Sequence, residues 1–208
     1  MRAIVKTIKP KICANIMNYI QSILVTKNKK EVTAIQKLID KYGYADIYVY
    51  CSKGNKKDWH LIEVIDTDTG WEGYEYDYYI GSKGYLDWCL EGKVVAKFTV
   101  RKVEEIEKYT YPNYYGEDVC DDDDFYYLES QPLSERKYDG LQKTTCLSEE
   151  ELYEYLDDKQ GYAYHIEDLE IFDKPKELSE FYEFGEPINE PIMNAPQSYR
   201  YCFVENEE

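Results

Sequence analysis

A chain of 208 residues with 43% hydrophobic and 16% aromatic content can bury a real core, which excludes a wholly disordered protein. Its net charge of −17 excludes broad binding to nucleic-acid phosphates, because such binding depends on lysine and arginine displacing counterions. No apolar run approaches the roughly 18 residues that span a bilayer. The charged start MRAIVKTIKPK lacks the apolar core of a secretory signal, so we expect a single cytoplasmic domain.

Metal-binding patterns are missing from the sequence. The six cysteines form no C-x-x-C pair, and only His60 and His165 are present. In a cytoplasmic setting these cysteines are expected to be reduced. We therefore predict no metal site and no cofactor.

Charge is distributed unevenly along the chain. Residues 1–60 hold 12 lysines and arginines against 4 acidic residues, whereas residues 61–208 hold 13 against 38. One interpretation is a basic partner, such as a protein that handles nucleic acid. The other is that an acidic surface keeps the protein soluble and monomeric.

In the first half of the chain, patterns predict two strands and two helices. Ala3–Ile8 reads as a strand, and Pro10 suits the first position of a helix with an apolar stripe of isoleucines. The segment Glu31–Lys41 predicts a second amphipathic helix, with Gly43 as its left-handed cap. Asp46–Lys53 is rich in aromatic and β-branched residues and predicts a strand.

The second half alternates predicted strands with two segments of irregular composition. Further strands are expected from His60, over Gly92–Ile106 as one long strand, over Tyr162–Phe172 until Pro175 breaks it, and over Ser198–Val204. Ser148 and Glu151 form a capping box that begins a helix. Residues 70–87 are rich in glycine and tyrosine and read as irregular, and residues 109–140 show little periodicity, so we place insertions at about 54–91 and 108–145.

Many strands with few helices favour a mixed barrel over a doubly wound sheet. The segment GYAYHIEDLEIFDKPKELSEF from Gly161, followed by APQSYRYCFVE from Ala195, resembles the C-terminal half of an ASCH domain. The start AIVKTIKPKICANIM extends the resemblance. It implies an α+β, PUA-like β-barrel with flanking helices, of a type often carried by phages and mobile elements, and hence a bacterial host cell.

Enzymes of this family carry a pattern close to G-x-K-T-x-E-x-R just after the first helix, where a lysine activated by a carboxylate serves as base or nucleophile. Aligned without a gap, those places here hold Tyr19, Gln21, Ser22, Leu24 and Thr26. No acidic residue lies between Ile4 and Lys30, and Ala96 and Lys97 occupy the place of a second acidic residue. The departure predicts a protein without catalytic residues. An alternative for this stretch is that the helix simply continues through Gln21 to Leu24.

The resemblance also places a set of residues at the cleft or its mouth, where basic and aromatic groups hold a phosphate and stack a base. Alternatively, Tyr164 and Tyr199, which stand where the family usually has Trp, are half-buried barrel residues and His165 is a core histidine. The predicted cleft comprises Lys9, Lys11, Ser22, Tyr50, Lys53, Tyr164, His165, Gln197, Ser198 and Tyr199.

Tyrosine and acidic residues alternate in the two insertions, and the chain has 24 tyrosines in all. Tyrosine gives rigid contact area at low entropic cost, so carboxylates among tyrosines can imitate stacked bases on a phosphate backbone. The alternative is a solvated loop, since like-charge runs are usually disordered and this run lacks calcium-loop spacing. The predicted acidic surface comprises Tyr76, Asp77, Tyr115, Asp121, Asp122, Asp123, Asp124 and Tyr126.

Three functions follow from these observations. The first is a non-catalytic ASCH-like protein that inhibits a basic, nucleic-acid-handling host defence protein through its acidic surface. The second is an ASCH domain whose cleft binds RNA or a modified nucleoside. The third is a hydrolase with a rearranged site that uses Ser22, Lys27 or His165.

Overall fold

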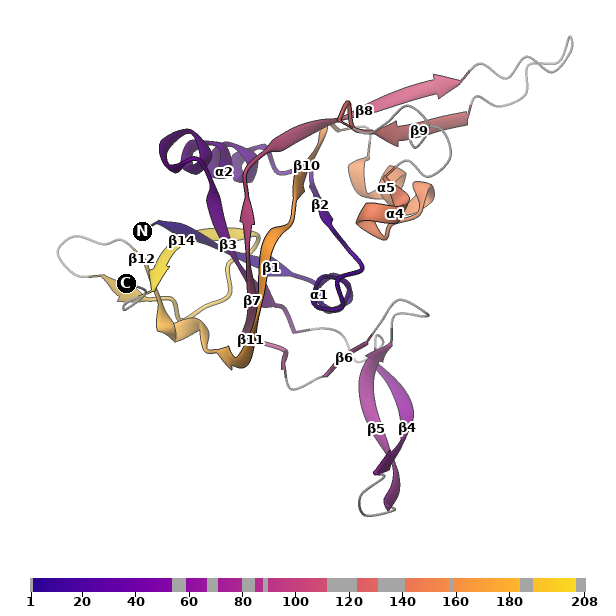
Figure 1. Ribbon diagram of the computed structural model, residues 1–208, viewed down its shortest axis with the longest axis vertical. Helices are drawn as coiled ribbons and strands as arrows, with labels where there is room; N and C mark the ends of the chain where they lie inside the picture. Colours follow the sequence, from indigo (N-terminus) through magenta and orange to yellow (C-terminus); the bar gives the residue numbers. More distant parts are fainter. Residues whose placement is uncertain are drawn as a thin grey trace, which may run out of the picture.

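The computed structural model describes residues 2–53, 59–66, 71–79, 85–87, 90–111, 123–130, 141–157, 159–183 and 189–204. Within these residues, curled β-sheets and a few helices form a barrel-like α+β fold, which confirms the predicted fold at that level (Figure 1). The largest sheet has the strand order β11-β7-β3-β1-β14-β12-β13. Its strands are β1 (Ala3–Ile8), β3 (Ala45–Cys51), β7 (Val94–Val100), β11 (Glu167–Lys176), β12 (Phe181–Glu183), β13 (Glu190–Pro191) and β14 (Tyr199–Val204).

A second sheet has the order β2-β10-β8-β9, and a third has the order β4-β5-β6. The second contains β2 (Ile23–Thr26), β8 (Val103–Tyr111), β9 (Asp123–Tyr127) and β10 (Gly161–His165). The third contains β4 (Trp59–Asp66), β5 (Trp71–Tyr79) and β6 (Tyr85–Asp87). The chain passes directly from the first sheet to the second at β7–β8, and back again at β10–β11.

These two passages are the corners of the barrel, and one arginine joins them. Arg101, between β7 and β8, donates to Glu167 at 2.6 Å and to Asp168 at 2.5 Å, both at the start of β11. Asp168 has a φ of 46°, in the left-handed region. The segments Gly92–Ile106 and Tyr162–Phe172 are therefore not single long strands as predicted, because each passes from one sheet to the other at one of these corners. Pro175 does not end β11, which continues to Lys176.

The N-terminal strand lies inside the largest sheet and anchors the core. β1 pairs in parallel with β3 and antiparallel with β14, and its side chains are nearly all buried. Apolar residues from β1, β3 and β7 pack against the two N-terminal helices; Ile4, Ile16, Ile35, Ile47 and Phe98 are each fully buried there. Such burial is the main favourable term in folding.

The helices begin and end at the residues that their local chemistry selects. α1 (Pro10–Met17) begins at Pro10 as predicted, but it stops at Met17, because Tyr19 adopts a φ of 57° and β2 follows. The extension through Gln21 to Leu24 is therefore wrong. α2 (Lys29–Tyr42) is capped by Asn28 and by Gly43 at a φ of 82°. α5 (Glu149–Leu156) has the predicted capping box; the shorter helices are α4 (Gln142–Thr145) and η4 (Leu178–Glu180).

Two β-hairpins replace much of the irregular structure that composition predicted. β4 pairs with β5 from Trp59 opposite Tyr78 to Asp66 opposite Trp71, so this part of residues 70–87 is regular. β8 pairs with β9 from Glu107 opposite Tyr127 to Tyr111 opposite Asp123. Both hairpins extend away from the barrel (Figure 1). The glycines and acidic residues suggested irregular structure, but aromatic residues such as tyrosine favour strands, and they are frequent in both hairpins.

Candidate functional site

A buried polar cluster lies where α2 meets the barrel, and its centre is Glu31. The Glu31 side chain is fully buried, and its Oε1 accepts from Lys6 Nζ at 2.6 Å and from the Tyr164 hydroxyl at 2.9 Å. Its Oε2 accepts from Ser198 Oγ at 2.7 Å, and Asn28 Nδ2 donates to Ser198 Oγ at 3.2 Å. These five residues, which we call the Glu31 cluster, join β1, α2, β10 and the start of β14.

Local structure brings these side chains together. Asn28 Oδ1 accepts from the backbone N–H groups of Lys30 and Glu31, which fixes the first turn of α2 and directs Glu31 inward. Lys6 lies opposite Tyr199 in the β1–β14 ladder, so its strand passes next to Ser198. Tyr199 then donates its hydroxyl to the Lys30 carbonyl at 3.1 Å. The helix start and two strands are thereby fastened to one another.

The electrostatics of the Glu31 cluster favour a closed, fixed arrangement. Burial, the charge of Glu31 and its hydrogen bond raise the pKa of Tyr164 well above its ordinary value, so the phenol stays protonated and donates. The buried carboxylate is paired with a lysine and uses both of its oxygens. Such a cluster holds elements together, and donors from the protein occupy both oxygens of Glu31.

A second polar group surrounds Glu104 on β8. Its Oε1 lies 2.8 Å from His165 Nε2 and accepts from Ser130 Oγ at 2.8 Å, while Oε2 accepts from Lys102 Nζ at 2.7 Å. Burial raises the pKa of Glu104, but the hydrogen bonds from Lys102, His165 and Ser130 outweigh it and hold this pKa below the ordinary value. His165 is thus held at the barrel corner by a carboxylate, and Ser130 connects the end of β9 to the same point.

The predicted cleft residues do not form a single set of contacts. Tyr164, Ser198 and Tyr199 meet at Glu31 and the start of α2, whereas His165 contacts Glu104. Lys11 pairs with Glu151 of α5 at 3.1 Å. Tyr50 is buried, and Tyr50 and Lys53 both lie beside Gly92. The side chains of Lys9, Ser22 and Gln197 are exposed.

The central residues of the site, Lys6 and Glu31, were not predicted. Glu31 is an acidic residue in the first turn of a helix, which commonly interacts with the helix dipole at the surface. The available signal was Lys6, a charged residue within the apolar strand AIVKTI. A buried lysine requires a partner, and Glu31 is the nearest acidic residue along the chain.

The predicted acidic surface is described only in part. Tyr76 and Asp77 lie on β5 opposite Leu61 and His60. Asp123 and Asp124 lie on β9 opposite Tyr111 and Thr110. The prediction for Tyr115, Asp121 and Asp122 falls outside the described residues.

The prediction that Tyr126 belongs to the acidic surface is wrong. It is 7% exposed and packs with Ile106, Leu128 and Leu152. Its ring is part of the core beneath the β8–β9 hairpin and offers no surface contact.

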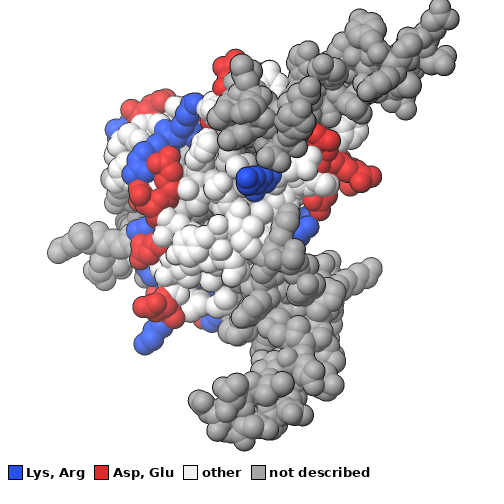
Figure 2. Space-filling view, turned by 45° about the vertical axis from the view of Figure 1, so that its right-hand side comes forward, with Lys and Arg blue, Asp and Glu red and all other residues white. Residues whose placement is uncertain are grey.

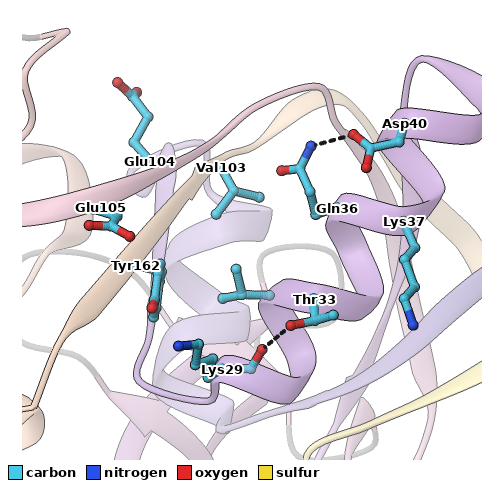
Figure 3. Close-up of a pocket in the computed structure, with 10 residues that line it drawn as sticks. Lys29, Thr33, Gln36, Lys37, Asp40, Val103, Glu104, Glu105 and Tyr162 are labelled. Atoms are coloured by element: carbon cyan, nitrogen blue, oxygen red, sulfur yellow. Dashed lines mark hydrogen bonds between the residues drawn. The ribbon is translucent and has the colours of Figure 1, made fainter.

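A groove with a volume of about 400 Å³ lies between α2 and the strands β8 and β10 (Figure 3). Lys29, Thr33, Gln36, Lys37 and Asp40 line it from α2, together with Val32. Val103, Glu104, Glu105 and Tyr162 line it from the strands. Its volume falls in the usual range for small-molecule sites.

In the described part of the chain, no group of three or more histidine, cysteine or acidic residues could hold a metal ion. No described helix combines the length and apolar character needed to cross a membrane. Searches found no protein-family model, curated protein or solved structure that matches this chain.

Proposed function

We propose that this chain is a non-catalytic, ASCH-like barrel of phage or mobile-element origin that binds a basic, nucleic-acid-handling host protein and inhibits it. The contacts are made by the β4–β5 and β8–β9 hairpins. The observation that carries the proposal is the placement of the acidic, aromatic segments on two hairpins that extend from the barrel (Figure 1).

Composition concentrates binding chemistry in these segments. Residues 54–91 and 108–145 together hold 18 acidic residues against 7 lysines and arginines, so they account for most of the net charge. They also contain all three tryptophans and 12 of the 24 tyrosines. Aromatic residues are enriched at interaction hot spots, and acidic charge steers association with a basic partner. On the view of Figure 2, by contrast, the described body shows both signs of charge around a largely uncharged centre.

The site geometry supports a binding role over catalysis. The Glu31 carboxylate has both oxygens occupied by donors, and the places of the family's lysine and glutamate hold Gln21 and Leu24. Tyr19, at the place of the family's glycine, has the left-handed φ of 57° that favours glycine. This backbone feature supports the proposed resemblance, whereas the lost side chains support the loss of catalysis.

The test is a pull-down from a bacterial lysate with the wild type and a variant in which Asp121, Asp122, Asp123 and Asp124 are changed to Asn. A matched control removes four exposed charges elsewhere, with Glu149, Glu150, Glu154 changed to Gln and Asp173 to Asn. The wild type and the control should capture the same DNA- or RNA-binding protein, and added duplex DNA should displace it. The Asp-to-Asn variant should lose it, since desolvated charge contacts cost about 2–5 kcal/mol when one side is removed.

Equal capture by all three proteins would refute the acidic-surface proposal. RNA binding at low salt that disappears in a Lys9→Glu, Lys53→Glu variant would favour the cleft-binding alternative instead. Turnover of a nucleoside or RNA substrate that requires Ser22 or His165 would refute the loss of catalysis.

A further inference from the structure

The groove between α2 and strands β8 and β10 has oppositely charged walls that do not pair with each other. Lys29 stands on the helix and points toward the strands, and Glu105 stands on β8. Lys37 lies on the side of α2 away from Glu105, and the helix also carries Asp40, which accepts from Gln36 (Figure 3). Among the described residues, no hydrogen bond or ion pair involves the side chain of Lys29, Lys37, Glu105 or Tyr162. Free charges of opposite sign on facing walls are available to a third group that carries both signs.

The scaffold keeps these walls apart. α2 is fixed at its first turn by the Glu31 cluster, and it is packed on the barrel through Ala34, Ile35 and Leu38. β8 is held by its ladder with β10 and by the contacts of Glu104. Neither wall is free to close the groove, so its charges remain separated and preorganised.

The strand wall carries a specific recognition element. Tyr162 and Glu105 are direct register partners in the β10–β8 ladder, so their Cβ atoms lie about 4.5–5.5 Å apart on one face. A phenol ring beside a carboxylate suits a flat cation, because guanidinium stacks on an aromatic face and forms paired hydrogen bonds with carboxylate. The helix wall offers the Lys29 ammonium group for an anion, and Val32 and Val103 supply apolar surface.

We propose that this groove binds a zwitterion of the arginine type, in which a guanidinium contacts Glu105 and Tyr162 and a carboxylate contacts Lys29. Two sources share this chemistry: free arginine, and an arginine at the carboxyl end of a peptide. The site uses the start of β8, before its pairing with β9 begins at Glu107, and it does not depend on the proposed function.

The test is isothermal titration calorimetry of the full chain with L-arginine, citrulline, agmatine and the peptide glycyl-glycyl-arginine. L-arginine or the peptide should bind saturably, and the tighter of the two names the source. Citrulline has a neutral group in place of the guanidinium, and agmatine lacks the carboxylate. Each should bind at least about tenfold more weakly than L-arginine, because one charge-assisted contact is lost.

Single substitutions test the contacts of the strand wall and those of the helix wall separately. Glu105→Gln should weaken L-arginine and agmatine alike, by about tenfold. Lys29→Gln should weaken L-arginine but not agmatine, whose terminal ammonium is repelled by the Lys29 charge. Tyr162→Phe should retain binding and Tyr162→Ala should lose it. Thermal melting checks that each variant is folded. Because the side chains of Glu105 and Lys29 are exposed, the Glu105→Gln and Lys29→Gln variants should melt at the same temperature as the wild type.

Absence of saturable binding by both arginine ligands would overturn the proposal. Equal affinity for citrulline would overturn the guanidinium contact, and equal affinity for agmatine would overturn the carboxylate contact.

Discussion

The Glu31 cluster and the two hairpins differ in how their acidic residues are distributed: one carboxylate enclosed by its partners, against many acidic residues in series along the chain. Glu31 is completely buried, accepts three hydrogen bonds and is neutralised by Lys6. The hairpins hold most of the excess negative charge on elements that extend from the barrel. A buried charge must be paired, whereas a solvated charge contributes little to folding and remains available to a partner. The same residue type thus stabilises the fold around Glu31, and we propose that it serves recognition in the hairpins.

Of the substitutions considered, Glu31→Ala should cause the largest loss in the free energy of unfolding. It leaves Lys6 buried without its counter-charge, and removal of one member of a buried ion pair costs about 3–5 kcal/mol. Urea denaturation should show this loss in the free energy of unfolding. The matched control is Glu149→Ala on the exposed start of α5, which should change it by less than about 0.5 kcal/mol. A Glu31→Ala loss below about 1 kcal/mol would show that the Glu31 cluster does not fasten α2.

A double substitution sharpens the same point. Lys6→Met alone should be strongly destabilising, because it leaves the Glu31 charge buried. The combination Lys6→Met with Glu31→Gln should recover part of that loss, since no uncompensated charge remains. Chemical denaturation of the two single variants and the double variant measures the coupling. Strictly additive effects would argue against direct pairing of Lys6 with Glu31.

Tyr164→Phe should have an intermediate effect. It removes one donor from the buried Glu31 carboxylate and keeps the ring, so the free energy of unfolding should fall by about 1–3 kcal/mol. Because the pKa of Tyr164 is raised in the fold, its hydroxyl stabilises below the ordinary tyrosine pKa, and this contribution is lost as pH rises through the folded value. The difference between wild type and Tyr164→Phe should therefore shrink in strong alkali. A constant difference across that range would contradict the buried donor.

Glu104→Gln should have a smaller effect that depends on acidity. The folded pKa of Glu104 lies below its ordinary value, so its stabilisation is present above the ordinary glutamate pKa and is lost as pH falls through the folded value. Because Lys102 and His165 are partly exposed, we expect a loss of about 1 kcal/mol at neutral pH and little difference in acid. Denaturant titrations at several pH values provide the measurement. Equal losses at all pH values would show that its charge is not responsible.

Tyr19→Gly should produce the smallest change, and a favourable one. Tyr19 is 73% exposed, so little packing is lost, and glycine relieves the strain of a φ of 57°. We expect a gain of about 0.5–1 kcal/mol in the free energy of unfolding. Tyr19→Ala keeps the Cβ atom and serves as the control, which should show no gain. A gain in both variants would mean that the tyrosine ring, not the backbone, is the source of strain.

The sequence predicted those elements that carry their own boundary signals. Pro10 begins α1, Gly43 ends α2, and Ser148 with Glu151 begins α5, all within a few residues of the side chain responsible. The barrel corners were missed because Arg101 finds its partners more than sixty residues away. β5 was missed although its tyrosines alternate with acidic residues at the period of a strand, because its glycine content and charge were read as irregular structure. β9 was missed because the run of like charges at its start was read as a solvated loop.

The candidate site could also be predicted only in part, because its contacts join residues that are distant in sequence. Three predicted cleft residues, Tyr164, Ser198 and Tyr199, do meet near the start of α2. The residue at their centre was missed, since Glu31 is separated from Tyr164 and Ser198 by 133 and 167 positions. A single sequence contains each member of such a cluster but not the contacts that join them.

The pairing of β1 with β14 has a consequence for the order of events during synthesis. Ala3 lies opposite Cys202, so β1 receives one of its two neighbours only after all the residues between them have been synthesised. Until then, one edge of β1 has unpaired backbone groups, which are a template for wrong pairing. Contacts between such distant segments also slow folding. We therefore expect the nascent chain to need protection by chaperones until its last strand is in place.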